Sequence, residues 1–227
     1  MMRKLLAISC ILLISLCATS CINVLESIFI RANGSGTYSF AIDMSSMKSM
    51  LQMAGEEFDS DELLKEMNMD EASAIAKLDA IDGVSNAGTS FDEESFTIAI
   101  NFEFDNIDAL NKGMSTYLAD STETNPEMID YFSMNRKTIT RISINKFLDT
   151  FKASMMESAE GEGVDMAMVK MMFGDMYLAS EIKTERRLKS FNNEEYLQKD
   201  DNTISWKFYP FKDEDAKPNM GVTLKTK

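Results

Sequence analysis

The apolar run at residues 5–16 is the feature that most constrains this chain, because it decides which residues are left to fold. Two basic residues precede the run, and the small residues Ala18 and Ser20 follow it, directly before Cys21. A positive start, a short apolar run and small residues at the cleavage site are the parts of a secretory signal peptide. The run is shorter than the roughly 20 apolar residues that a spanning helix needs. We therefore expect residues 1–20 to be removed and the fold to be built from the rest.

The end of this segment, Leu16-Cys17-Ala18-Thr19-Ser20-Cys21, resembles the lipobox of bacterial lipoproteins. In that family the cysteine sulfur receives a diacylglycerol, the chain is cut on the amino side of the cysteine, and the new terminus is acylated with a fatty acid such as palmitate. The resemblance implies lipid attachment at Cys21. Ordinary secretion stays open as an alternative, since Ala18 and Ser20 would also suit the general signal peptidase, but it would leave Cys21 as a lone free thiol.

This signal implies a location in the bacterial cell envelope, with the lipid anchor in the outer membrane or in the outer face of the plasma membrane. The formal net charge of the whole chain is −14. Such a charge repels the phosphate backbone of nucleic acids, so we expect no nucleic acid among the partners. The expected partners are the membrane, through the lipid on Cys21, and a lipid or an envelope protein.

The residue types that remain after cleavage exclude several kinds of chemistry. Two of the three cysteines leave with the signal peptide and the third is the expected anchor, so no disulfide is expected. The chain has no histidine, which removes the commonest general base and the commonest zinc ligand. We therefore expect no metal site, no cofactor and no catalytic residues. An extracytoplasmic hydrolase that uses carboxylates is the alternative to this non-enzymatic protein.

Alternating apolar and polar residues predict strands at residues 37–43 and 95–104. The second is the clearer one, and its shared apolar face is formed by Phe96, Ile98, Ile100, Phe102 and Phe104. Asp105 or Asn106 is expected to cap a helix that ends near Leu118. Residues 84–91 are expected to pair with 95–104 in a hairpin closed by Asp92-Glu93-Glu94, and a second hairpin is expected around Asn135 and Arg136. Further strands are expected in the last third of the chain, at residues 177–191, 194–198, 204–211 and 220–225.

Helical spacing of apolar residues is found over residues 45–54, 63–67, 70–78, 147–158 and 164–173, and the last two stretches are separated by Glu160-Gly161-Glu162-Gly163. Strands and helices without regular alternation predict an α+β fold, in which an antiparallel β-sheet with hairpins packs against several amphipathic helices. The expected organisation is a signal peptide at 1–20, a lipidated tether at 21–34 that ends in a glycine hinge, and an α+β domain at 35–227. A helical insert is expected near residues 147–176.

Methionine is unusually common, with 19 residues in the chain, many of which cluster at 44–53 and 155–176. Thioethers can bind copper(I), which is a soft ion. They can also line an adaptable groove for a lipid or another apolar ligand, or fill irregular volume in a core. Core packing is the simplest interpretation, because methionine at helical spacing normally faces a core. The acidic run at 56–62 lacks the ligand spacing of a calcium loop and is read as a solvated loop.

Three short motifs carry a resemblance to a known group of proteins: Gly36-Thr37-Tyr38-Ser39-Phe40, the strand at 96–104 followed by Asp105-Asn106-Ile107-Asp108-Ala109-Leu110, and Asn202-Thr203-Ile204-Ser205-Trp206. Over residues 35–211 the chain resembles the LppM- and YehR-type bacterial lipoproteins, from which the methionine-rich segment at 147–176 departs. The resemblance implies a tethered α+β domain that binds lipids or envelope glycolipids. It carries over no catalytic residues, and it does not say which residues bind the ligand.

Overall fold

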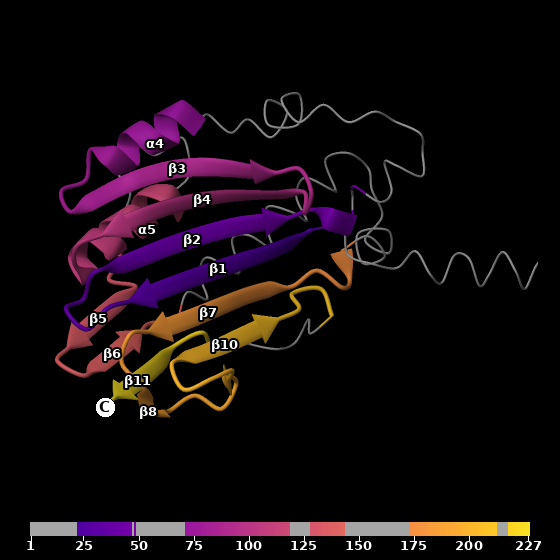
Figure 1. Ribbon diagram of the computed structural model, residues 1–227. Helices are drawn as coiled ribbons and strands as arrows, with labels where there is room; N and C mark the ends of the chain where they lie inside the picture. The colour runs from indigo at the N-terminus through magenta and orange to yellow at the C-terminus, as the bar shows by residue number, and fades with distance from the viewer. Residues whose placement is uncertain (1–21, 47, 49–70, 119–127, 144–172, 213–217) are drawn as a thin grey trace, which may run out of the picture.

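The computed structural model describes residues 22–46, 48, 71–118, 128–143, 173–212 and 218–227, and these residues form two β-sheets with two helices (Figure 1). In the seven-stranded sheet the spatial order is β3 (Val84–Asp92), β4 (Thr97–Phe104), β2 (Gly36–Asp43), β1 (Asn23–Ile30), β7 (Leu178–Thr184), β10 (Thr203–Phe208) and β9 (Leu197–Gln198). In the four-stranded sheet it is β5 (Phe132–Asn135), β6 (Thr138–Arg141), β11 (Val222–Thr226) and β8 (Leu188–Phe191). The helices are α4 (Glu71–Asp79) and α5 (Ile107–Leu118).

The predicted α+β fold, an antiparallel sheet packed against several amphipathic helices, is wrong. The described residues are mostly strand and contain only the helices α4 and α5. The large sheet is mixed rather than antiparallel, because its central strands β1 and β7 run parallel. Much of the layer behind it is a second sheet, which long-range pairing assembles from residues 132–141, 188–191 and 222–226.

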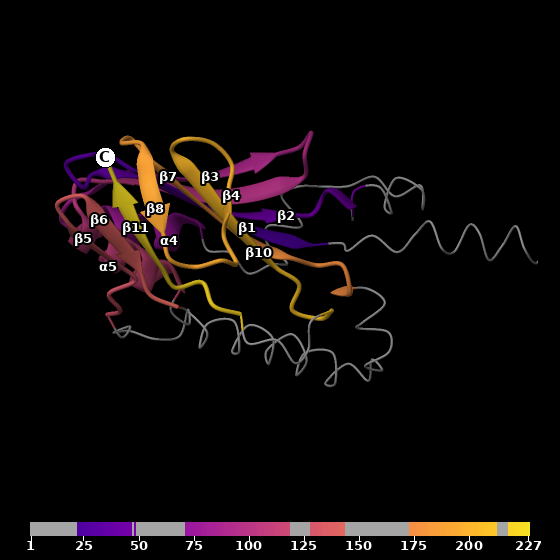
Figure 2. The ribbon, with the colours of Figure 1, turned by 90° about the horizontal axis from the view of Figure 1, so that it is seen from below.

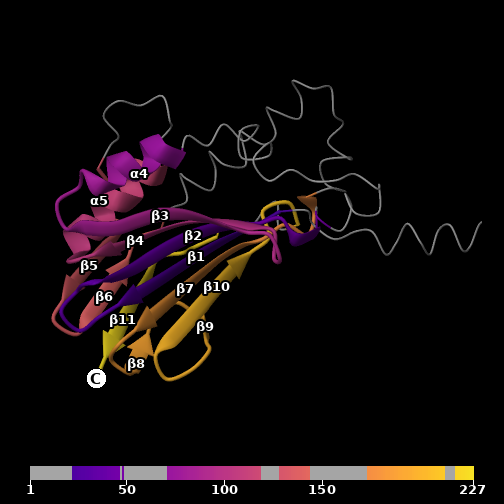
Figure 3. The same ribbon diagram turned by 45° about the horizontal axis from the view of Figure 1, so that its top comes forward.

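The small sheet and α5 lie on the same side of the large sheet, which we call its inner side (Figure 2). Side chains alternate between the two faces of a strand, so every second residue of β1 points inward. Val24, Glu26, Ile28 and Ile30 are accordingly buried. Figure 3 shows α4 beside α5 at the β3 edge of the large sheet. The core therefore lies between the large sheet and a layer made of α5 and the small sheet.

The segment expected to be a tether is a central strand. Residues Asn23–Ile30 form β1, which pairs with β2 along its whole length, from Asn23 opposite Asp43 to Ile30 opposite Gly36. The glycine hinge is a tight turn between these strands. A Cβ atom at Gly36 would lie 1.8 Å from the backbone oxygen of Phe29, so only glycine fits this close approach.

Several local predictions are confirmed. The strands expected at 37–43 and 95–104 are β2 and β4, and the shared face of β4 is buried, with Phe102 and Phe104 each 1 % exposed. Helix α5 ends at Leu118 and is capped by Asn106, whose side-chain oxygen accepts a hydrogen bond of 2.9 Å from the backbone of Ala109. Within the described residues, no helix has the length and apolar character needed to cross a membrane.

Candidate functional site

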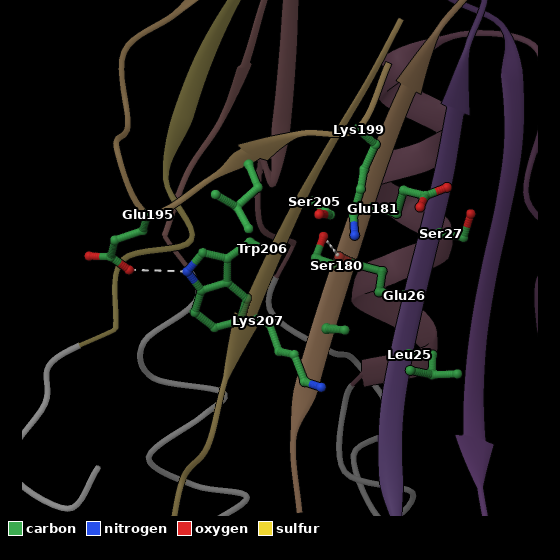
Figure 4. Close-up of a pocket in the computed structure, with 12 residues that line it drawn as sticks. Leu25, Glu26, Ser27, Ser180, Glu181, Glu195, Lys199, Ser205, Trp206 and Lys207 are labelled. Atoms are coloured by element: carbon green, nitrogen blue, oxygen red, sulfur yellow. Dashed lines mark hydrogen bonds between the residues drawn. The ribbon is translucent and has the colours of Figure 1, made fainter.

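A pocket with a volume of about 440 Å³ opens on the outer face of the large sheet, over β1, β7 and β10 (Figure 4). The edge strand β9 and the residues beside it form its rim. Apolar, hydroxyl and charged side chains all contribute to the lining. The lining residues are Leu25, Glu26, Ser27, Ala179, Ser180, Glu181, Glu195, Leu197, Lys199, Ser205, Trp206 and Lys207.

The register of the three strands builds the floor of the pocket in two rows. In one row Leu25 lies opposite Ala179, which in turn lies opposite Lys207. In the next row Ser27, Glu181 and Ser205 are aligned in the same way. Because residues two apart on a strand share a face, these six side chains all belong to the outer face. The first row is therefore apolar except for Lys207, and the second row is polar throughout.

Lys199 and Lys207 extend from opposite ends of the pocket (Figure 4). The ammonium group of Lys207 lies 3.4 Å from the ring centroid of Tyr177 and 5.0 Å from that of Tyr209, a cation–π arrangement. Glu195 is held at the rim, since its Oε2 atom accepts hydrogen bonds from Trp206 Nε1 at 3.1 Å and from the backbone N–H of Asn219 at 3.3 Å. The pocket thus presents fixed charges of both signs.

A buried ionic network lies directly beneath the pocket, on the inner side of the same two strands. Arg141 of β6 donates from Nη1 to the carboxylate of Glu26 in β1 and, at 2.7 Å, to the hydroxyl oxygen of Ser180 in β7. The Ser180 hydroxyl in turn donates to Glu26 Oε2 at 2.7 Å. The side chain of Arg141 is fully buried and that of Glu26 is 7 % exposed. This network ties the small sheet to the two central strands that carry the pocket.

The guanidinium of Arg141 stays charged in this interior. Burial by itself would lower the pKa of Arg141, but the charge and hydrogen bond of Glu26, together with Tyr196 and Tyr38, raise that pKa above its usual value. The ring centroid of Phe132 lies 5.3 Å from the guanidinium carbon and adds a cation–π contact. Nε and Nη2 of Arg141 have no hydrogen-bond partner among the described residues. The ion pair therefore leaves part of the hydrogen-bonding capacity of Arg141 unused.

Tyr38 and Tyr196 lie near the network, and removing the hydroxyl group of one or of the other is expected to change the stability of the protein in opposite directions. The buried hydroxyl of Tyr38 has no partner in the described part of the chain, and burial raises its pKa well above the usual value. The hydroxyl of Tyr196 donates to the backbone oxygen of Met220 at 2.8 Å. We expect Tyr38→Phe to raise the free energy of unfolding by about 1 kcal/mol and the matched Tyr196→Phe to lower it by about the same amount. Urea unfolding of both variants measures this, and stabilisation of both or destabilisation of both would contradict it.

Most sequence-predicted site residues lie outside the described residues. These include Cys21 and all methionines of the two clusters except Met44 and Met176. Both exceptions are at most 1 % exposed, so at these two positions methionine packs in the core. The described residues contain no group of three or more acidic, cysteine or histidine residues placed to hold a metal ion. The pocket residues themselves were missed, because their strands are adjacent in space but far apart in the sequence.

Comparison with known proteins gives little further information. No family model matches the chain, and no curated protein matches it. Among solved structures, the chain is similar to the folded domain of the Mycobacterium tuberculosis protein LppM. The TM-score is 0.45 and the sequence identity 10 %, over 92 % of this chain and 90 % of that one. This similarity is too low to support a conclusion about function.

Proposed function

We propose that the mature protein is a lipid-anchored, non-enzymatic binding protein of the bacterial cell envelope, and that the pocket over β1, β7 and β10 binds the polar part of a lipid or of another amphiphile. The observation that supports this most is the position of the pocket relative to the proposed anchor. Leu25, in the pocket floor, follows Cys21 by only four residues. An extended chain spans at most about 3.6 Å per residue, so Leu25 lies within about 14 Å of the acylated residue.

The lining of the pocket suits such a ligand. Lys199 and Lys207 can pair with an anionic group, and the hydroxyls of Ser27 and Ser205 can hydrogen-bond to a hydroxylated one. Leu25 lies beside them and offers apolar contact. Concave sites that bind small molecules combine apolar surface with a few polar groups in this way. A phospholipid or glycolipid headgroup together with the start of its acyl chain has the matching chemistry.

The anchor is tested by the variant Cys21→Ser. We expect this substitution to abolish incorporation of labelled fatty acid and to move the protein from the membrane fraction to the soluble fraction, because several acyl chains hold a protein to a bilayer far more firmly than surface contacts do. Labelling of cells with a radioactive or clickable fatty acid, followed by fractionation, measures both effects. Continued labelling of the variant would overturn the assignment of Cys21.

The pocket is tested separately by Lys199→Ala combined with Lys207→Ala in the acylated protein. Loss of a charged hydrogen-bond donor costs roughly 1.5–3 kcal/mol, so we expect the amount of bound lipid to fall at least about tenfold. Mass spectrometry of lipids that remain with the purified protein measures this. The matched control replaces the exposed Lys189 and Lys225 of the small sheet with alanine. Equal lipid content in all three proteins would show that the pocket is not the binding site.

A further inference from the structure

Two tyrosines and two lysines form a cluster at one end of the large sheet. The rings of Tyr177 and Tyr209 lie 6.0 Å apart in an edge-to-face arrangement. The ammonium group of Lys207 lies against both rings, and that of Lys212 lies 5.5 Å from the ring centroid of Tyr209. Both lysines are exposed, and the two tyrosines are partly exposed. We call these four residues the tyrosine–lysine patch.

The patch adjoins the first residues of β1. Tyr177 directly precedes β7, which runs parallel to β1, and its backbone oxygen accepts a hydrogen bond of 2.9 Å from Val24. The backbone N–H of Tyr177 donates to the side-chain oxygen of Asn23 at 3.4 Å. Tyr209 directly follows β10, which runs antiparallel to β7 and so ends where β7 begins. Figure 1 shows β1 and β7 starting, and β10 ending, at the same end of the sheet.

We infer that the tyrosine–lysine patch contacts the headgroup region of the bilayer that holds the acyl chains of Cys21. This inference depends on the proposed acylation of Cys21. Asn23 follows Cys21 by two residues, so it can be no more than about 7 Å from the acylated residue. The headgroup layer on each side of the hydrocarbon core is itself about 5–8 Å thick. The start of β1, and with it Tyr177, is therefore held at the membrane surface.

The side chains of the patch are those that favour this position. Tyrosine combines an apolar ring with a polar hydroxyl and is enriched where membrane meets water. A lysine beside it can lay its methylene stem on the apolar region and keep its ammonium group among the lipid phosphates. The Nζ atom of Lys212 is also 3.6 Å from Oδ1 of Asp175. Both side chains are exposed to solvent, so this ion pair is weak and the ammonium group stays accessible.

At the same end of the large sheet, the ends of β2 and β3 carry negatively charged side chains. Asp43 ends β2 and Asp92 ends β3, and the turn after β3 contains Glu93 and Glu94. The nearby Lys48 is engaged with the backbone oxygens of that turn. Since anionic lipids repel carboxylates and attract lysine, we expect the domain to tilt so that the β7 and β10 corner approaches the bilayer and the β3 corner is raised.

The orientation is measured with the acylated full-length protein reconstituted in vesicles that contain lipids spin-labelled at the headgroup. The thiol of an acylated Cys21 is blocked, so a single introduced cysteine can be labelled with a fluorophore. The label is placed at Lys212→Cys or, as the control, at the exposed Lys183→Cys of β7. Lys183 is six residues along β7 from Tyr177, about 20 Å away. We expect strong quenching at position 212 and none above background at 183.

A second arm adds Tyr177→Ser and Tyr209→Ser to the protein labelled at position 212. These changes remove the aromatic surface, and we expect the quenching to fall severalfold. Equal quenching at 212 and 183, or no quenching at either in a protein that carries fatty acid and stays with the vesicles, overturns the inference and leaves the proposed anchor in place. A protein that carries no fatty acid and does not stay with the vesicles overturns both.

Discussion

Replacing Glu26 with methionine is expected to lower the free energy of unfolding by about 3–5 kcal/mol, because the Arg141 guanidinium would remain buried without its charged partner. The side chain of Arg141 is fully buried, and its other side-chain acceptor, the Ser180 hydroxyl, is neutral. The converse variant Arg141→Met should cost a similar amount, since it leaves the Glu26 carboxylate uncompensated in the same interior. Chemical denaturation monitored by the fluorescence of Trp206, the single tryptophan, measures both effects.

The double variant Glu26→Met with Arg141→Met should be less destabilised than either single variant. Replacing a whole buried ion pair by apolar residues removes the cost of burying charge and is often close to neutral. The exposed pair of Asp108 and Lys112 in α5 is the control, and Lys112→Ala should cost no more than about 0.5 kcal/mol. Additive losses in the double variant would contradict the account, since they would show that the two side chains stabilise the protein independently of each other.

Replacing Phe102 with alanine is expected to lower the free energy of unfolding by about 3–5 kcal/mol, as truncations of buried phenylalanine do. Phe102 is 1 % exposed, and its ring centroid lies 5.0 Å from that of Tyr38 on the neighbouring strand. On its other side the ring packs against Gly113 of α5, where an added Cβ would be 2.7 Å from the ring. A loss below about 1 kcal/mol would show that the cavity collapses or that the ring is not held in the core.

Gly113→Ala tests the contact between Gly113 and Phe102, because the substitution should destabilise the protein when Phe102 is present and stabilise it when Phe102 is replaced by alanine. In the native protein the new methyl group would be forced against a buried ring, and we expect a loss of about 1–3 kcal/mol. In the Phe102→Ala background there is room for the methyl group, and alanine should gain about 1 kcal/mol over glycine in a helix. Gly88→Ala in strand β3, with nothing within 4 Å of the added Cβ, is the control for adding a methyl group where there is space for it.

The sequence predicts well those elements whose pattern is local. Strand β4 carries an uninterrupted apolar face, and α5 has both an asparagine cap and helical spacing, so their bounds are nearly correct. Strand β1 was missed because its inward row contains Glu26 between Val24 and Ile28. A charged residue at a core position breaks the alternation from which a strand is recognised. The local sequence does not show that Glu26 is paired with Arg141, because Arg141 is 115 residues away.

The small sheet and the pocket could not be predicted for a related reason. Residues 177–191 read as one strand, but they divide into β7 and β8, which belong to different sheets. The small sheet then depends on pairing of β11 with both β6 and β8. The pocket needs the register of β1 against β7 and of β7 against β10. Which of these strands are neighbours cannot be inferred from any single stretch of the sequence.

The parallel pairing of β1 with β7 has a consequence for the order in which the protein folds. Val24 pairs with Leu178, so β1 has no partner on one edge until most of the chain has been synthesised. Contacts between residues so distant in sequence form slowly, because a long loop must close first. That delay leaves the open edge of the β1–β2 hairpin free to pair with other chains, so we expect a chaperone that covers this edge to reduce aggregation while the protein folds.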